Sequence, residues 1–354
     1  MKDRDICLVT GGCGFIGSHV IEELLVSTDW LIINVDFMGI GSSENYKSKD
    51  ARVVNYDMDI NNNYVEKLFD EMKPKYVIHL AAESHVDRSI ESPSDFIHSN
   101  INGTCRILEC VKKHDCRMVH VSTDEVYGHL EPNEEGFNEH SPLQPRSPYA
   151  ASKASSDLMV LSYRTTYGID ASITRCCNNY GPRQHEEKLI PTIVRSYMQG
   201  KKIPVYGDGL QQREWVHVKT HASAIIEVLL LHGGEDIYHI SGCSYNVEDD
   251  HKSISNMDLI ERITYLLEKE QHEEHDRLGI QHPLDLAMWD AHQYIEHVED
   301  RKAHDYRYEL CTHYQDRITK ACADQEDMDL KETVHYYVDR YYKSLSSSLV
   351  GTSL

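Results

Sequence analysis

The chain lacks an excess of positive charge. Its 354 residues include 36 lysines and arginines against 58 aspartates and glutamates, which gives a formal net charge of -22. A molecule with this charge repels phosphate backbones and anionic membrane surfaces, so we expect no binding of nucleic acid or membranes. Apolar runs of roughly 18 residues, which a membrane-spanning helix needs, are also missing. Because the apolar pattern begins at Ile6 without a signal-peptide profile, we expect a cytoplasmic protein.

The chain also lacks the cysteine patterns of disulfide frameworks and zinc sites. Ten cysteines are spread irregularly between Cys7 and Cys322, and none forms a Cys-x-x-Cys pair. This usage favours a reduced intracellular compartment. Four histidines lie between residues 272 and 292, but their spacing matches no known metal-ligand pattern. We therefore expect no metal site.

What the chain does contain is a globular α/β pattern. Hydrophobic residues make up 40% of it and charged residues 27%, which is enough for a large core and too apolar for disorder. Strands that alternate with helices form βαβ units, so the first half of the chain predicts a doubly wound parallel sheet. We expect strands at 6–10, 31–36, 76–81 and 118–123 and helices at 15–26, 64–72, 96–113 and 149–167.

The second half predicts a smaller mixed α/β lobe for a substrate. After residue 177, prolines and the Gly207-Asp208-Gly209 turn break the chain into short elements. Later, repeated Glu, His and Asp without a clear apolar face predict a solvated insertion, and a serine-rich end predicts a flexible tail. The expected boundaries are 1–177 for the first domain, about 212–234 for a segment that returns to it, 178–344 for the lobe, 268–293 for the insertion and 345–354 for the tail.

The strongest motif is a glycine-rich turn between the first expected strand and the first expected helix, Gly11-Gly12-Cys13-Gly14-Phe15-Ile16-Gly17. Gly11 permits a tight turn, Gly14 lets the backbone approach a pyrophosphate, and Gly17 allows close packing of the helix on the strand. This arrangement is the fingerprint of a Rossmann dinucleotide-binding domain. The cofactor-binding candidates in the turn are Gly11, Gly14, Phe15, Ile16 and Gly17.

Asp36, at the end of the second expected strand, indicates which dinucleotide binds. A carboxylate there can accept hydrogen bonds from both ribose hydroxyls and would repel a 2'-phosphate, so we expect NAD and not NADP. Asp59 and Ile60 follow the next expected strand and are candidates to hold the adenine. For Asp59 a solvated loop is an equally good interpretation, because aspartate is common in loops.

A second motif reads Ser147-Pro148-Tyr149-Ala150-Ala151-Ser152-Lys153. Ser147 can cap a helix whose first position is Pro148, so Tyr149 and Lys153 lie one turn apart on the same face. A tyrosine with a pKa of about 10 is a poor base at neutral pH. A neighbouring ammonium and a positive nicotinamide ring would favour the phenolate. The pair therefore predicts removal of a proton from an alcohol as its hydride leaves, with both residues also contacting the cofactor.

A third motif, Ser122-Thr123-Asp124-Glu125-Val126-Tyr127-Gly128, follows an expected strand. A loop at the carboxyl end of a parallel strand faces the ligand crevice. Redox chemistry alone needs neither acid of this motif. Two carboxyl groups in one pocket can take different protonation states, so Asp124 and Glu125 are candidates for an acid and a base. The alternative is a solvated turn with an aspartate at its tip.

Together these motifs resemble those of the extended short-chain dehydrogenase/reductase superfamily, and within it the nucleotide-sugar 4,6-dehydratases, especially those that act on dTDP-glucose. Simple sugar epimerases of the superfamily usually lack the Asp-Glu pair, so STDEVYG is the discriminating motif. The resemblance covers residues 6–219 almost continuously and returns at 300–308. The segments that carry it are GGCGFIGSHV, HLAAESHVDRSI, VSTDEVYG, SPYAASKASSD, NNYGP, EKLIP, VYGDG, REWVHV and DRKAHDYRY.

The resemblance implies a redox-neutral lyase with tightly held NAD. Tyr149 would take the proton of the sugar 4-hydroxyl, Glu125 would remove the carbon 5 proton, and Asp124 would protonate the departing 6-hydroxyl. Hydride would pass from carbon 4 to the cofactor and return to carbon 6. Thr123 would bond to the 4-oxygen, and Lys153 would hold the cofactor ribose and tune Tyr149.

The resemblance also implies the remaining contacts and a homodimer. The dimer would form through helices at 94–113 and 149–167. Ala81, Ala82 and Ser84 match cofactor contacts, and Ser84, Thr123 and Asn178 would lie near the sugar. The residues that match the nucleoside-diphosphate contacts are Lys188, Leu189, Pro204, Tyr206, Arg213, Asn256, Arg301 and His304.

The chain departs from the family pattern at the nucleotide end. Arg183 and His185 stand where aromatic or neutral residues are usual, and the family's Leu-Gly-Trp-x-Pro stretch is missing after Tyr308. Either dTDP-glucose or UDP-glucose is therefore the expected substrate. Two alternatives remain: an epimerase acting on a nucleotide sugar, and a non-catalytic protein that binds NAD and a nucleotide sugar.

Overall fold

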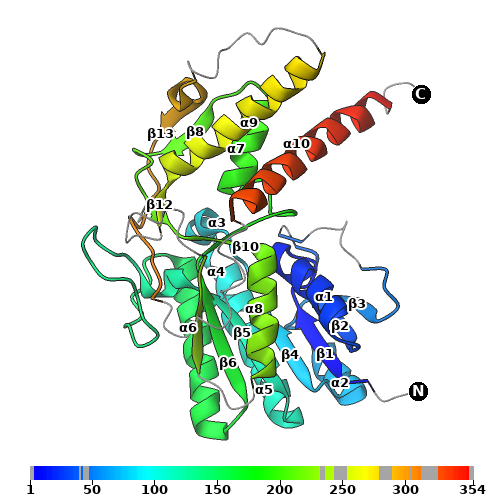
Figure 1. Cartoon of the computed structure of the whole chain (residues 1–354). Coiled ribbons are helices and arrows are strands. Elements are labelled where there is room, and N and C mark those ends of the chain that lie inside the picture. Colours follow the sequence, from blue (N-terminus) through cyan, green and yellow to red (C-terminus); the bar gives the residue numbers. More distant parts are fainter. Residues whose placement is uncertain are drawn as a thin grey trace.

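A seven-stranded sheet forms the main layer of the computed structural model (Figure 1). Its strand order is β11-β6-β5-β4-β1-β2-β3, and all the pairs are parallel. The strands are β1 (Ile6–Thr10), β2 (Leu31–Asp36), β3 (Val53–Asp57), β4 (Tyr76–His79), β5 (Arg117–Thr123), β6 (Ala171–Cys176) and β11 (Ile237–Ile240). The structure describes residues 4–39, 41–42, 48–231, 236–242, 253–278, 289–302, 304–311 and 326–350.

Helices cover both faces of this sheet. Because successive residues of a strand point to opposite faces, Leu8 and Val9 of β1 enter two different cores. The core on one side contains Leu24 of α1 and Leu229 of α8, and the core on the other contains Leu68 of α2. The helices of this domain are α1 (Phe15–Ser27), α2 (Tyr64–Met72), α3 (Val86–Glu91), α4 (Pro93–Phe96), the π-helix η2 (Ile97–Gly103), α5 (Thr104–His114), the 3-10 turn η3 (Asp124–Tyr127), α6 (Pro148–Tyr167) and α8 (Val218–Leu230).

The strand order places a crevice at the carboxyl edge of the sheet. The chain runs outward from β1 to β2 and β3 on one side, and from β4 to β5 and β6 on the other. The loops that leave β1 and β4 therefore diverge, and such a switch point is where doubly wound sheets bind ligands. Both the doubly wound sheet and the expected strand positions are confirmed.

A smaller lobe, in the upper half of Figure 1, follows β6 and has its own core. Buried side chains of three helices, among them Ile193, Ile263 and Val334, form this core. The lobe contains three two-stranded pairs, β7 with β10, β9 with β12, and β8 with β13. Its elements are β7 (Asn178–Tyr180), α7 (Leu189–Met198), β8 (Ile203–Tyr206), β9 (Gln212–Arg213), β10 (Trp215–His217), β12 (Ile254–Ser255), α9 (Asn256–Leu278), η5 (Ala291–Tyr294), β13 (Ile295–Val298) and α10 (Glu326–Val350).

Two expectations for this lobe differ from the structure. Helix α9 continues to Leu278, and Glu268 within it is only 5% exposed because its carboxylate accepts hydrogen bonds from the hydroxyls of Tyr197 and Tyr294. A solvated surface is therefore wrong at Glu268, although residues 279–288 of the expected insertion lie outside the described residues. Helix α10 runs to Val350, into the expected flexible tail, of which residues 351–354 lie outside the described part.

Two further features concern the described residues only. No helix among them combines the length and the apolar character that crossing a membrane requires. The eight cysteines in the described ranges are free thiols, and no group of three or more His, Cys, Asp or Glu side chains there is arranged to hold a metal ion.

Neighbouring leucines of α8 provide a test of this packing. Leu229 is fully buried, whereas Leu230 is 47% exposed. Leu229→Ala leaves a cavity and should lower the free energy of unfolding by about 2–5 kcal/mol. Leu230→Ala should change it by about 0.5 kcal/mol or less. Urea denaturation of both variants measures the difference, and equal losses would contradict the packing of α8 on the sheet.

Candidate active site

The glycine-rich turn leaves β1 and opens α1, and the turn's own amides donate within the protein. Gly11 has φ +74°, and a Cβ there would lie 2.8 Å from the amide nitrogen of Ala81. A Cβ on Gly17 would lie 2.2 Å from the carbonyl oxygen of Gly11. Gly14 precedes α1 without a side-chain cap, so the first amides of the helix are available to an anion. This cradle fits the pyrophosphate of NAD.

Asp36, at the end of β2, lies against the same turn and is 6% exposed. Its Oδ2 accepts from the backbone amide of Cys13 at 2.8 Å, and its Oδ1 accepts from the amide of Met38 at 2.8 Å and the hydroxyl of Ser42 at 2.6 Å. The carboxylate is thus held at the predicted position beside the turn. A ribose would have to replace the Ser42 hydroxyl to reach Oδ1.

The other expected cofactor residues lie along the same edge. Ala81 and Ala82 follow β4, and the amide of Ala81 donates to Thr10 Oγ1 at 3.1 Å. Ile60 is 4% exposed and packs against Gly103 of η2. Asp59 accepts from the amide of Asn61 at 2.7 Å and pairs with His98 at 3.1 Å. Asp59 therefore has protein partners, and the structure shows no preference for adenine.

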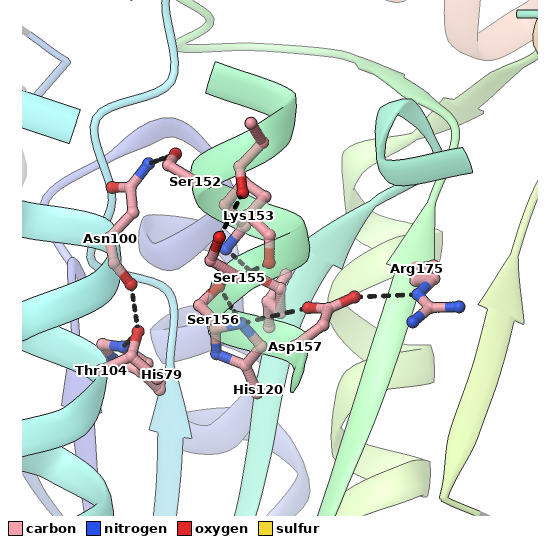
Figure 2. Close-up of polar contacts among 12 residues, drawn as sticks. His79, Asn100, Thr104, His120, Ser152, Lys153, Ser155, Ser156, Asp157 and Arg175 are labelled. Carbon is pink, nitrogen blue, oxygen red and sulfur yellow. Dashed lines mark hydrogen bonds and ion pairs between the residues drawn. The ribbon is translucent and has the colours of Figure 1, made fainter. Parts of the chain in front are cut away.

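A buried hydrogen-bond chain connects the loop after β4 to η2, and Figure 2 shows its section from His79 through Thr104 to Asn100. The amide of Ala81 donates to Thr10, whose hydroxyl lies 2.7 Å from Nδ1 of His79. Nε2 of His79 lies 3.0 Å from Thr104 Oγ1, which donates to the backbone oxygen of Asn100. Burial holds the pKa of His79 well below its usual value, so the ring is neutral and carries one proton. The chain fixes this edge of the crevice.

Asn100 in the π-helix then reaches the catalytic helix. Its side chain donates to Ser152 Oγ at 2.8 Å and exchanges two hydrogen bonds with the backbone of Glu83. π-Helical turns are rare and often mark functional sites. Sequence reasoning did not identify Asn100, because a π-helix has no clear composition signal.

The loop after β5 places two carboxyl groups in the crevice. Thr123 Oγ1 accepts from the amide of Glu125 at 3.3 Å, which starts η3, and its hydroxyl donates to Asp124 Oδ1 at 3.1 Å. Asp124 is 1% exposed. Burial, and next the charge of Glu125, raise the pKa of Asp124 well above its usual value. Burial also raises the pKa of Glu125, an effect that Lys188 and Arg213 oppose.

Helix α6 begins as its sequence predicts. Ser147 Oγ accepts from the amide of Ala150 at 3.1 Å, and Pro148 is the first helical residue. Tyr149 and Lys153, at 8% and 4% exposed, lie one turn apart on the face that meets the catalytic loop. The side chain of Thr123 opposes the rise in the pKa of Tyr149, which indicates that the two motifs lie close together.

Burial is the main influence on the pKa values of Tyr149 and Lys153. Burial, Glu125 and Asp124 raise the pKa of Tyr149, so no phenolate is favoured in the ligand-free site. Lys153 donates from Nζ to the backbone oxygen of Val121 at 2.8 Å, and burial lowers its pKa to about 8. Stabilisation of a Tyr149 phenolate by Lys153 stays a prediction. The phenolate is expected from two charges together, the ammonium of Lys153 and the positive nicotinamide ring of a bound cofactor.

Cationic side chains surround the other side of Glu125. Lys188, Arg213 and Arg301 all act on its carboxyl group. Lys188 lies before α7, and its Nζ donates to the backbone oxygen of Ser84 at 3.4 Å. Arg213 donates to the backbone oxygens of Asp305 and Tyr306. The structure thus brings these three expected phosphate contacts, and Ser84, next to the catalytic carboxyls.

The outer nucleotide contacts form a second group. The guanidinium of Arg301 pairs with Asp87 of α3, with Nε–Oδ1 at 2.6 Å and Nη2–Oδ2 at 2.9 Å, and lies 5.2 Å from the ring centroid of Tyr206. The ring of His304 lies 6.4 Å from that of Tyr206. A phosphate would therefore meet Arg301 beside an aromatic ring that can stack on a base.

Four expected contacts lie apart from these groups. Asn178 pairs with Trp215 in the short β7–β10 sheet, and Asn256 bonds to Gln211. Leu189 starts α7 and packs against the core of the lobe, whereas Pro204 is exposed on β8. No described contact joins these four side chains to Glu125.

The segment after His304 contains site residues that sequence reasoning missed. Asp305 is 6% exposed, pairs with Arg146 at 2.8 Å and accepts from the hydroxyl of Tyr308 at 2.5 Å. The guanidinium of Arg213 lies 4.4 Å from the ring centroid of Tyr308. Both residues belong to the DRKAHDYRY motif, but sequence reasoning assigned no role to Asp305 or Tyr308.

Comparison with known proteins gives a consistent result. Residues 8–308 match the family model described as GDP-mannose 4,6 dehydratase. The chain is 36% identical over 347 residues to dTDP-glucose 4,6-dehydratase of Neisseria meningitidis serogroup B, which covers 94% of this chain and 93% of that protein.

Two solved structures extend the comparison. A dTDP-glucose 4,6-dehydratase from Streptomyces venezuelae with NAD and TYD bound is 36% identical, with a TM-score of 0.78 over 94% of this chain and 97% of the other. A UDP-N-acetylglucosamine 4-epimerase from Methanobrevibacter ruminantium is 26% identical, with a TM-score of 0.79 over 96% and 100%.

Gly17→Ala tests the dinucleotide cradle. The new Cβ would meet the backbone of Gly11 and Gly12, so the turn must distort. Distortion of this kind costs on the order of 1–3 kcal/mol, and an equal loss of binding energy corresponds to a roughly 5- to 150-fold lower affinity for NAD. Gly41→Ala is the control, because no atom lies within 4 Å of its added Cβ. Titration of NAD measures both, and unchanged affinity in Gly17→Ala would contradict the site.

Proposed function

Because this chain belongs to the family described as GDP-mannose 4,6 dehydratase, as a member similar to the dTDP-glucose 4,6-dehydratases, we propose that it is an NAD-dependent nucleotide-sugar 4,6-dehydratase. Family membership confirms the resemblance that the sequence motifs indicated. The proposed reaction converts dTDP-glucose, or UDP-glucose, to the nucleotide-linked 4-keto-6-deoxy sugar with loss of water. It makes no net change in oxidation state.

The adjacent carboxyl groups of Asp124 and Glu125 are the observation that supports dehydration most directly. Oxidation at carbon 4 needs only a base and a hydride acceptor. Loss of water across carbons 5 and 6 needs in addition a base for the carbon 5 proton and an acid for the 6-hydroxyl. Asp124 is buried and Glu125 is partly buried, both have a raised pKa, and the cations Lys188 and Arg213 oppose the rise at Glu125. Such different surroundings separate the protonation states of two carboxyls.

The proposed roles follow from these surroundings. Glu125, opposed by Lys188 and Arg213, is the carboxyl that ionises more readily and is the proposed base at carbon 5. Asp124 keeps its proton and is the proposed acid that gives it to the departing 6-hydroxyl. Tyr149, one turn before Lys153 on α6, is the proposed acceptor of the 4-hydroxyl proton. Bound NAD would supply the hydride acceptor and return the hydride to carbon 6.

The nucleoside diphosphate is proposed to bind on the cationic side of Glu125. Arginine suits bidentate contact with phosphate oxygens, and Arg213 and Arg301 both lie there with Lys188. His304 and the ring of Tyr206 lie beside Arg301. Relatives that act on dTDP-glucose make this the first substrate to test, with UDP-glucose as the second.

We also propose a homodimer through α6 and its neighbours. Leu158 and Tyr167 of α6 are 56% and 54% exposed, and Ile97 in the adjoining η2 is 50% exposed. Exposed large apolar side chains on these elements are available to an association surface. This surface lies on helices that the sequence comparison predicted for the dimer.

Incubation with NAD and either nucleotide sugar tests the reaction. The product should have lost one water and gained a 4-ketone, as observed by mass spectrometry and NMR. Glu125→Gln keeps the size of the side chain but removes the base, so turnover should fall by about 10²- to 10⁴-fold. A product that keeps its 6-hydroxyl would indicate an epimerase, and no product from any nucleotide hexose would contradict the proposal.

The pH dependence tests the two roles. The pKa of Glu125 is raised and the base must be ionised, so kcat/KM should fall as pH drops through that pKa. The pKa of Asp124 is raised further and the acid must be protonated, so kcat/KM should fall again as pH rises through it. A bell-shaped profile results. Asp124→Asn should reduce turnover and remove the alkaline limb. If that limb persists, it belongs to another group, such as Lys153 with its pKa of about 8.

A further inference from the structure

Arg175 is a buried charge on β6, the strand next to the edge strand β11 of the main sheet. It lies on β6, is 1% exposed, and is paired through the backbone with Ser122 of β5 and with His239 of β11. Removal of a guanidinium from water is costly unless its hydrogen bonds are satisfied in good geometry. Its partners therefore constrain where it lies, and it constrains them in return.

The first partner is on the catalytic helix. Nε of Arg175 donates to Oδ2 of Asp157 at 2.9 Å, and Asp157 is fully buried (Figure 2). Tyr149, Lys153 and Asp157 are spaced by four residues, so they share one face of α6. Although burial raises the pKa of Asp157, its bonds to His120 and Arg175 lower it overall, so the carboxylate is ionised.

The second partner is on the catalytic loop. Nη1 of Arg175 donates to the hydroxyl oxygen of Tyr127 at 2.5 Å, and the guanidinium carbon lies 4.7 Å from the centroid of the Tyr127 ring. Tyr127 is the last residue of η3, the turn that contains Asp124 and Glu125. It is 1% exposed and stacks on Phe137 with 4.9 Å between centroids.

Beyond Tyr127, the hydrogen bonds continue to His239 and then to the backbone of Cys311. Nδ1 of His239 lies 3.0 Å from the backbone oxygen of Cys311, which can only accept, so the proton of the neutral ring is on Nδ1. Burial lowers the pKa of His239 to about 4, consistent with a neutral ring. Nε2 is then the acceptor for the Tyr127 hydroxyl at 2.6 Å. The hydroxyl of Tyr127 thus accepts from Arg175 and donates to His239, and these two bonds orient it.

We propose that Arg175 is a positioning residue, which fixes the turn carrying Asp124 and Glu125 relative to the helix carrying Tyr149 and Lys153. The proposal deepens the proposed function and rests on it, because both pairs must address one sugar ring. We call the contacts of Arg175 with Asp157 and Tyr127 the Arg175 bridge. Oxidation at carbon 4 and loss of water across carbons 5 and 6 involve adjacent atoms, so a small shift between the pairs misplaces one of them.

Tyr127→Phe cuts one end of the Arg175 bridge and keeps the aromatic ring. The ion pair of Arg175 with Asp157 remains, so the fold should survive. Tyr163→Phe is the matched control, because it also removes one tyrosine hydroxyl. The hydroxyl of Tyr163, on α6, donates to Glu109 at 2.5 Å on the exposed surface. Arg175→Lys is a second variant, since an ammonium keeps the charge but cannot span both partners in the same geometry.

The first measurement needs no substrate or cofactor. Hydrogen–deuterium exchange of the backbone amides at 124–128 should become faster in Tyr127→Phe and in Arg175→Lys, with α6 amides unchanged in Tyr127→Phe. Tyr163→Phe should exchange like the wild type at 124–128. Unchanged exchange at 124–128 in both bridge variants would overturn the proposal, whether or not the protein is a dehydratase.

The second measurement separates positioning from general stability. With dTDP-glucose, Tyr127→Phe should lose about 10- to 100-fold in kcat while KM stays near that of the wild type and the melting temperature changes little. A wild-type kcat, or a loss explained entirely by unfolding, would overturn the positioning role. A wild type that makes no product from any nucleotide hexose would contradict the proposed function instead, and the exchange result would still stand.

Discussion

Parallel pairing of β5 with β4 and β6 is the constraint on which the site depends. It aligns Ser122 with Arg175 and Thr123 with Cys176, and it ends where the catalytic loop begins. The same sheet brings the loop after β4 beside the glycine-rich turn after β1, close enough that Gly11 has no room for a side chain. Because the strand register is fixed, the cofactor cradle and the loop after β5 are held at one edge of the sheet.

Burial is the second constraint, and it acts on every titratable group of the site. It raises the pKa of Asp124, Glu125 and Tyr149 and lowers that of Lys153. Burial therefore disfavours the charged form of each of these four groups, and nearby cations oppose this effect at Glu125. A bound dianionic nucleotide and a cationic cofactor ring would change this balance, which ties the protonation of the site to its occupancy.

Local patterns were sufficient for the elements whose residues interact within a few positions. Ser147 and Pro148 predicted the start of α6, and the glycine turn with Asp36 predicted the cradle, because caps and tight turns depend on neighbours in sequence. Local patterns failed at Glu268, where two tyrosines from other elements satisfy a carboxylate that composition assigns to the surface. They also missed Asn100, Asp305 and Tyr308, whose partners lie far away along the chain.

The sequence by itself determined the alternation of strands and helices and the dinucleotide turn, and it supplied the candidate catalytic side chains, since each is encoded by spacing within a short segment. Only the tertiary structure decided which charges meet. It paired Arg301 with Asp87, bonded Lys153 to the backbone of Val121, and placed Arg175 between α6 and the catalytic loop. The physical reason is that Coulomb interactions depend on distance and burial, and both are set only when distant segments pack together.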